Sequence, residues 1–68
     1  MEKVKITTEY IKLEQMMKLA GIVGSGSHAK MIIGEGSVKV DGKVELQRGK
    51  KLRPGNVVEY NGIEYIIE

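Results

Sequence analysis

The segment Lys12–Gly42 constrains the fold most, because two helical patterns in it are followed directly by a tight-turn signal. The first pattern has four apolar residues at the i, i+3, i+4, i+7 spacing of one helix face, namely Leu13, Met16, Met17 and Ala20. Gly21 is well placed to end this helix in the left-handed conformation. Either Thr7 or Thr8 is expected to cap its start.

A second, shorter helix is predicted after the connector Gly24–Ser27, where either serine can act as the N-cap. Three apolar residues form its inner face and Lys30 faces outward, the inner residues being Ala29, Ile32 and Ile33. Gly34 or Gly36 ends this helix.

Two hairpins complete the pattern. Asp41-Gly42 and Asn61-Gly62 are preferred pairs for two-residue type I′ turns. The strands predicted around them are Val38–Val40 with Val44–Leu46, and Val57–Tyr60 with Ile63–Ile67. Val4–Thr7 reads as a lead-in strand, and Pro54-Gly55 as a type II turn. The predicted class is α+β: two short helices packed on a small, mostly antiparallel sheet of about four to five strands.

The length of 68 residues fits a single domain spanning 1–68. The chain has no cysteine, which excludes disulfides and thiolate metal sites and fits a reducing cytosol. Met1–Lys5 carries no apolar leader, and no run approaches the roughly 20 apolar residues of a membrane span. We therefore expect a soluble cytoplasmic monomer with no membrane contact.

The charge is distributed unevenly although the net charge is only +2. From Lys12 to Arg53 the chain has nine lysines and arginines against four acids, a net charge of +5, while the remaining residues carry −3. The run Gln47–Arg53 alone holds four positive charges and no acid. This distribution predicts a charged face, and the plainer alternative is a solubilising lysine-rich surface.

Catalysis and cofactor binding find little support. His28 is the only histidine and has no cysteine partner, and the acids are scattered, so neither a nucleophile nor a metal site is predicted. Gly49-Lys50 resembles the end of a phosphate-binding loop, but Val44 stands where its first glycine should be. We expect no enzyme activity, cofactor or small-molecule substrate.

Nucleic-acid binding has better support. Lysine, serine hydroxyls and backbone N–H groups at a helix start all suit phosphate oxygens, and the segment Ser25–Lys30 offers each of them. The run Arg48–Arg53 could reach the same phosphate backbone. The chain has no phenylalanine or tryptophan and only three tyrosines, at 10, 60 and 65, which argues against binding single strands by stacking. These features favour structured RNA.

The order of these motifs resembles the RNA-binding domain named after ribosomal protein S4, over about Lys12 to Tyr60. The parts that carry the resemblance are the two helices, the hairpin Gly36-Ser37-Val38-Lys39-Val40-Asp41-Gly42, and Pro54-Gly55-Asn56-Val57. The resemblance implies the helix-helix-hairpin fold called the alpha-L motif, as in small stand-alone bacterial members that are RNA-binding or ribosome-associated. It also implies that the matching positions Lys12, Ser25, Lys30 and Lys39 contact RNA. The chain departs from the family at Gly26, where an arginine is usual, and at His28, where an acid is common.

The leading hypothesis is therefore a non-catalytic RNA-binding protein that docks on structured, plausibly ribosomal RNA. The candidate contact residues are Lys12, Ser25, Ser27, His28, Lys30, Lys39, Arg48, Lys50, Lys51 and Arg53. We expect them to form one positive surface beside the start of the second helix. A protein-interaction adaptor with a basic face, using Met31 as a contact, and a duplex-DNA binder are the alternatives.

Overall fold

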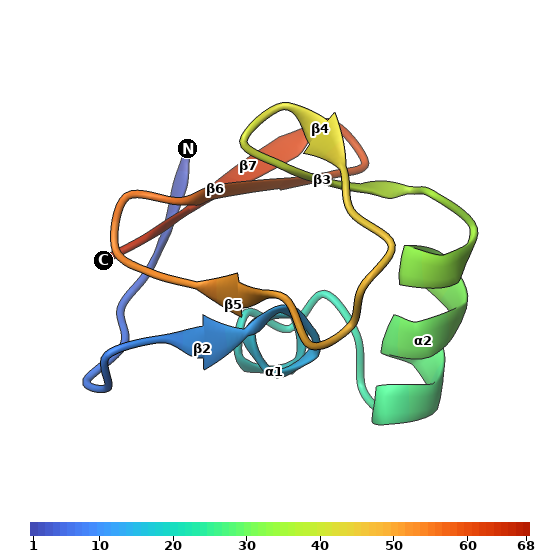
Figure 1. Ribbon diagram of the computed structural model, residues 1–68, viewed down its shortest axis with the longest axis horizontal. Helices are drawn as coiled ribbons and strands as arrows, with labels where there is room; N and C mark the ends of the chain where they lie inside the picture. The colour runs from blue at the N-terminus through green and yellow to red at the C-terminus, as the bar shows by residue number, and fades with distance from the viewer.

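In the computed structural model, which describes residues 1–68, a five-stranded sheet forms one layer, and two helices with a two-stranded ribbon form the other (Figure 1). The elements are β1 (Glu2–Val4), β2 (Ile11–Lys12), α1 (Leu13–Leu19), α2 (Gly26–Gly34), β3 (Val38–Val40), β4 (Lys43–Val44), β5 (Lys51–Leu52), β6 (Val57–Tyr60) and β7 (Ile63–Ile67). The large sheet has the order β1-β7-β6-β3-β4, and β2 pairs with β5. Only β1 and β7 run parallel, so the predicted α+β class and mostly antiparallel sheet are confirmed.

Both predicted hairpin turns are present. The φ angles are 51° at Asp41 and 84° at Gly42, and 55° at Asn61 and 80° at Gly62. Two successive positive φ values define the type I′ turn, whose twist suits the flanking strands. The predicted return strand Val44–Leu46 is present, but it begins one residue earlier and is shorter, covering Lys43–Val44. The Glu45 N–H still donates to the Val38 carbonyl at 2.9 Å, and Leu46 is exposed.

The N-terminal strand also lies earlier than its β-branched residues suggested. It covers Glu2–Val4 rather than Val4–Thr7, because its pairing with β7 sets Val4 beside Ile67 at the end of the sheet. Ile6 still donates its N–H to the Glu68 carbonyl at 2.8 Å, although it is no longer in a strand. The N- and C-terminal segments therefore hold each other in place.

Helix α1 begins later than expected, and neither Thr7 nor Thr8 caps it. Lys12 is the N-cap, with φ −74° and ψ 148°, because β2 keeps the chain extended up to that residue. The Lys12 N–H donates to Gln15 Oε1 at 3.2 Å, so a side chain one turn into the helix anchors its start. At the other end Gly21 has φ 75°, which confirms the predicted left-handed stop.

The cap, the end and the inner face of helix α2 agree with the prediction. Ser25 is the N-cap, and its Oγ accepts a hydrogen bond from the His28 N–H at 3.2 Å. The helix ends at Gly34, and Gly36 follows with φ 80°. This left-handed glycine turns the chain directly into β3.

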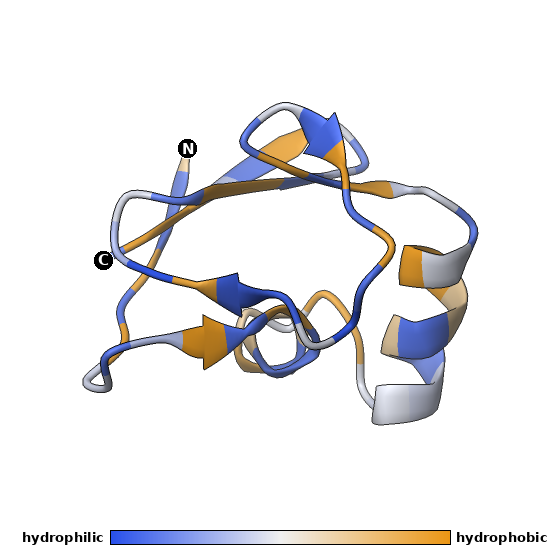
Figure 2. Ribbon diagram, in the orientation of Figure 1, coloured by the Kyte–Doolittle hydropathy of each residue, from blue (hydrophilic) through white to orange (hydrophobic).

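The core lies between the sheet and the helices and contains thirteen buried residues, all apolar. Helix α1 contributes Leu13, Met16 and Met17, and the predicted inner face of α2 is also buried. In Figure 2 hydrophobic residues gather in the large sheet and on α2, whereas the segment leading into β5 is mostly hydrophilic. Among the residues of the ribbon, Leu52 is fully buried, which attaches β5 to this core.

Candidate nucleic-acid interface

The β2–β5 ribbon places two lysines directly opposite each other. Ile11 pairs with Leu52, and Lys12 pairs with Lys51. Since side chains alternate along a strand, the buried Leu52 turns inward while Lys12 and Lys51 are exposed on the other side. Like charges at paired positions of a sheet repel each other. The ribbon therefore carries a local excess of positive charge.

Tyr10 and Arg53 extend this surface by one further pair of residues. Tyr10 lies two residues before Lys12 and Arg53 two residues after Lys51, so alternation turns all four side chains the same way. The Tyr10 ring centroid lies 5.0 Å from Lys51 Nζ and 5.7 Å from Arg53 Cζ, which is within cation–π range. We call this surface the ribbon face and define it as Tyr10, Lys12, Lys51 and Arg53.

The segment before β5 adds two more basic residues at the start of α1. The Leu13 N–H donates to the Lys50 carbonyl at 2.8 Å, and the Glu14 N–H donates to the Arg48 carbonyl at 3.1 Å. These carbonyls satisfy N–H groups that the first turn of a helix leaves unpaired. The basic run thus crosses the beginning of α1 next to Lys12.

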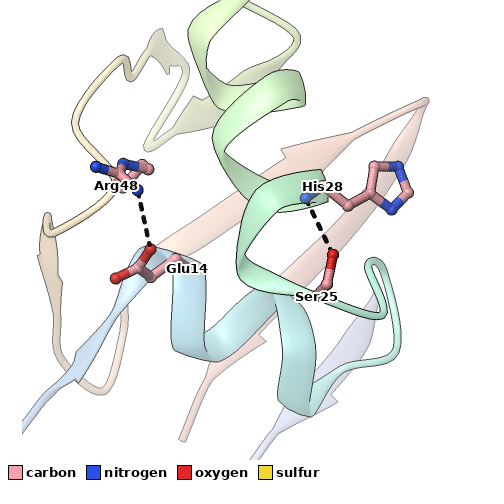
Figure 3. A network of polar contacts seen from close by, with 4 residues as sticks. All are labelled: Glu14, Ser25, His28 and Arg48. Atoms are coloured by element: carbon pink, nitrogen blue, oxygen red, sulfur yellow. Dashed lines mark hydrogen bonds and ion pairs between the residues drawn. The ribbon is translucent and has the colours of Figure 1, made fainter.

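Arg48 differs from the other cations of this region because it has a carboxylate partner. Its Nη1 lies 4.0 Å from Glu14 Oε2, and this is the only ion pair in the molecule (Figure 3). Both side chains keep contact with solvent, so the pair is worth about 0 to 1 kcal/mol. Lys12, Lys51 and Arg53 have no carboxylate within 4.0 Å.

The four candidate residues of α2 and its cap form a separate group. The Ser25 hydroxyl is engaged in capping, while Ser27 and Lys30 are exposed. The exposed His28 side chain points away from the Arg48–Glu14 pair in Figure 3. In Figure 1, α2 lies toward one end of the long axis and the ribbon toward the other, with α1 between them. Sequence reasoning placed a single positive surface beside the start of α2, whereas the structure gathers five of the seven candidate lysines and arginines at the ribbon and the start of α1.

Lys39 lies on a different face altogether. It is exposed between the buried Val38 and Val40, so its side chain is on the side of the large sheet turned away from the helices. Its cross-strand partner is Glu59, and Glu59 in turn pairs with Glu64. The structure therefore separates Lys39 from the ribbon face and places it opposite Glu59, with Glu64 one strand further along the sheet.

Tyr10 belongs to the ribbon face but was not among the candidate residues predicted from the sequence. The signal was present as two alternating triplets, Tyr10-Ile11-Lys12 and Lys51-Leu52-Arg53, each with an apolar residue between two polar or aromatic ones. Nothing local shows that the triplets pair, because they lie about 40 residues apart. The structure contains no cluster of three or more His, Asp or Glu side chains that could hold a metal ion. Neither helix has the length and apolar character needed to cross a bilayer.

Two helices packed on a mostly antiparallel sheet define a small α+β domain of the alpha-L type. The family model for the S4 domain matches residues 4–68, and the chain belongs to this family.

Similar proteins and a similar solved structure are consistent with this assignment. The chain is 42% identical over 59 residues to the "Probable ribosome maturation protein RlbA" of Bacillus subtilis, covering 87% of this chain and 83% of that protein. It is also 42% identical over 53 residues to the "Putative RNA-binding protein YbcJ" of Escherichia coli, covering 78% and 76%. The solution structure of YbcJ, described as revealing an alpha-L motif involved in RNA binding, superposes with a TM-score of 0.74 at 34% identity, over 98% of this chain and 86% of that one.

Proposed function

We propose that this protein binds structured RNA, ribosomal RNA in particular, through the ribbon face and the adjoining segment Arg48–Lys50, with no catalytic step. The observation that carries the proposal is the pairing of Lys12 with Lys51 in the absence of a nearby carboxylate. Folding brings these two charges together at a cost, and a phosphate between them would remove that cost. The names of the relatives support RNA as this anion.

The geometry suits contact with a phosphate backbone rather than base-edge reading. Lysine ammonium groups act as point charges, and the Arg53 guanidinium can meet a phosphate with two parallel hydrogen bonds. Such contacts position a protein on folded RNA by shape and charge. Exposed Ser27 and Lys30 on α2 would contact a neighbouring part of the same RNA. Lys39, beside Glu59, is outside the proposed interface.

The test is a salt titration of binding to structured ribosomal RNA, followed by fluorescence anisotropy. The double variant Lys12→Gln/Lys51→Gln should lose about tenfold or more in affinity at low salt, and the slope of log K against log salt should fall by about one to two units. The matched control is Lys3→Gln/Lys5→Gln, which removes the same charge from β1 and the residue after it, outside the ribbon face, and should bind as the parent does. Equal effects of the two double variants would show that only net charge matters.

Two alternatives give different outcomes in companion experiments. Duplex DNA should compete more weakly than folded RNA, since the 2′-hydroxyls belong to RNA alone. The adaptor alternative is favoured by Met31, which is 59% exposed on α2. Nuclease treatment of a lysate separates the cases, because a protein partner would remain bound to the immobilised chain while RNA would be lost.

A further inference from the structure

Tyr10 is the only tyrosine that the core does not use. Tyr60 and Tyr65 pack against the buried cluster from β6 and β7, whereas Tyr10 does not belong to it. The Tyr10 hydroxyl makes no hydrogen bond within the protein; only its backbone carbonyl is engaged, accepting from Thr8 Oγ1 at 2.8 Å. The Tyr10 ring is partly exposed and is not part of the core, so it can contact a ligand.

The ring also lines the one groove of the molecule. This groove is shallow and open, and it runs beside β2 and the outer side of α1. Its apolar lining is Tyr10, Ile11 and Leu19, and Leu19 is 60% exposed although it is apolar. Its polar lining is Thr8, Glu9, Lys12 and Gln15. Gln15 Oε1 is fixed by the Lys12 N–H, while the Gln15 amide nitrogen has no partner in the protein. An aromatic platform with a nearby amide donor matches the face and the edge of a nucleobase.

The cations decide what kind of ligand fits. Lys12 lines the groove, and Lys51 and Arg53 lie against the Tyr10 ring at 5.0 and 5.7 Å. A base stacked on Tyr10 would thus have its own phosphates within reach of the ribbon face. One ring and one groove can hold one base, and a base within a continuous duplex is already stacked and paired. The base must therefore be unpaired.

We infer that the groove between Tyr10 and α1 is a stacking site for one unpaired nucleobase. Resting on the proposed function, this makes the preferred ligand a structured RNA with a bulged or looped-out nucleotide. Phosphates on each side of that nucleotide contact Lys12, Lys51 and Arg53, and the base lies against the Tyr10 ring. Stacking of one base on an aromatic side chain contributes on the order of tenfold in affinity.

The test compares a fully paired RNA duplex with the same duplex carrying one bulged 2-aminopurine, using the full chain. The parent should bind the bulged RNA about tenfold more tightly and quench its 2-aminopurine fluorescence. Tyr10→Leu should lose both the preference for the bulged RNA and the quenching, so that it binds the two RNAs with equal affinity. Tyr10→Phe keeps the ring, removes only the unbonded hydroxyl, and should behave as the parent does. Circular dichroism checks that each variant is folded.

The outcomes separate this inference from the proposed function. If neither RNA binds, the proposed function fails and the stacking site fails with it. If both RNAs bind equally to the parent, or if Tyr10→Leu keeps the preference, RNA binding stands and the stacking site is overturned.

Discussion

Asp41 connects three parts of the chain at the scale of a single residue. It occupies the first left-handed position of the β3–β4 turn, with φ 51°. Its Oδ1 accepts from the Val57 N–H at 2.9 Å, and its Oδ2 accepts from Asn56 Nδ2 at 2.7 Å. Asn56 Oδ1 in turn accepts from the Arg53 N–H at 2.7 Å. A carboxylate in a turn thus helps to fix the strand that carries the ribbon face.

Replacing Asp41 by alanine should lower the free energy of unfolding by about 2 to 3 kcal/mol, because a left-handed residue and two charge-assisted hydrogen bonds are affected together. Asn61→Ala is the matched control, since Asn61 has the same backbone conformation with φ 55° and no side-chain hydrogen bond. It should lose only about 1 kcal/mol. Urea denaturation measures both values. Equal losses in the two variants would mean that the carboxylate contacts contribute nothing.

Lys12 gives a second prediction at this scale, in the opposite direction. Lys12→Gln should raise the free energy of unfolding by a few tenths of a kcal/mol at low salt, because it removes the repulsion from Lys51 and keeps the Lys51–Tyr10 contact. The gain should disappear at high salt, where exposed charges are screened. Lys30→Gln, an exposed lysine outside the ribbon face, serves as the control and should show no such gain. A loss of stability in Lys12→Gln would argue against repulsion at the ribbon.

The cap of α2 is the clearest case at the scale of an element. Ser25→Ala removes the acceptor of the His28 N–H and should lower stability by about 1 kcal/mol. Ser27→Ala changes a neighbouring exposed serine inside the helix and should stay within about 0.5 kcal/mol of the parent, because alanine suits a helix interior. Thermal unfolding of the two variants distinguishes them. A stable Ser25→Ala protein would show that α2 depends on its packing alone.

How well each element could be predicted depended on the range of the forces that form it. The type I′ turns at Asp41-Gly42 and Asn61-Gly62, the glycine stop at Gly21 and the inner face of α2 follow from neighbours in the sequence, and all were predicted. The start of α1 was not, because β5 pairs with Ile11 and Lys12 and keeps them extended. The ribbon itself consists of two-residue strands, which are too short for a periodic pattern to reveal.

The same reasoning applies to the candidate site. Composition and charge distribution indicated a polyanion ligand, and the cations of the run Arg48–Arg53 do lie beside Lys12. The location of the surface could not be predicted, because it depends on a pairing between segments about 40 residues apart. Lys39 was predicted from the resemblance to contact RNA, and strand alternation places it on the side of the large sheet turned away from the helices, apart from the ribbon face.

At the scale of the whole molecule, the free energy of unfolding depends strongly on Leu52, because the core is small. A chain of 68 residues has a free energy of unfolding of about 3 to 10 kcal/mol, whereas truncating a buried leucine costs about 2 to 5 kcal/mol. Leu52 is fully buried and holds β5, and with it the ribbon face, against the core. Leu52→Ala should therefore lose about half of the free energy of unfolding and unfold at a clearly lower denaturant concentration than the parent.

Leu46→Ala is the matched control, since it is the same substitution six residues earlier at a side chain that is 61% exposed. It should unfold within about 0.5 kcal/mol of the parent, because surface changes cost little. Denaturant titration followed by far-UV circular dichroism measures both variants. If Leu52→Ala were as stable as Leu46→Ala, the ribbon would be attached by its backbone hydrogen bonds to α1 alone, and the lysine pair on it would not depend on the core.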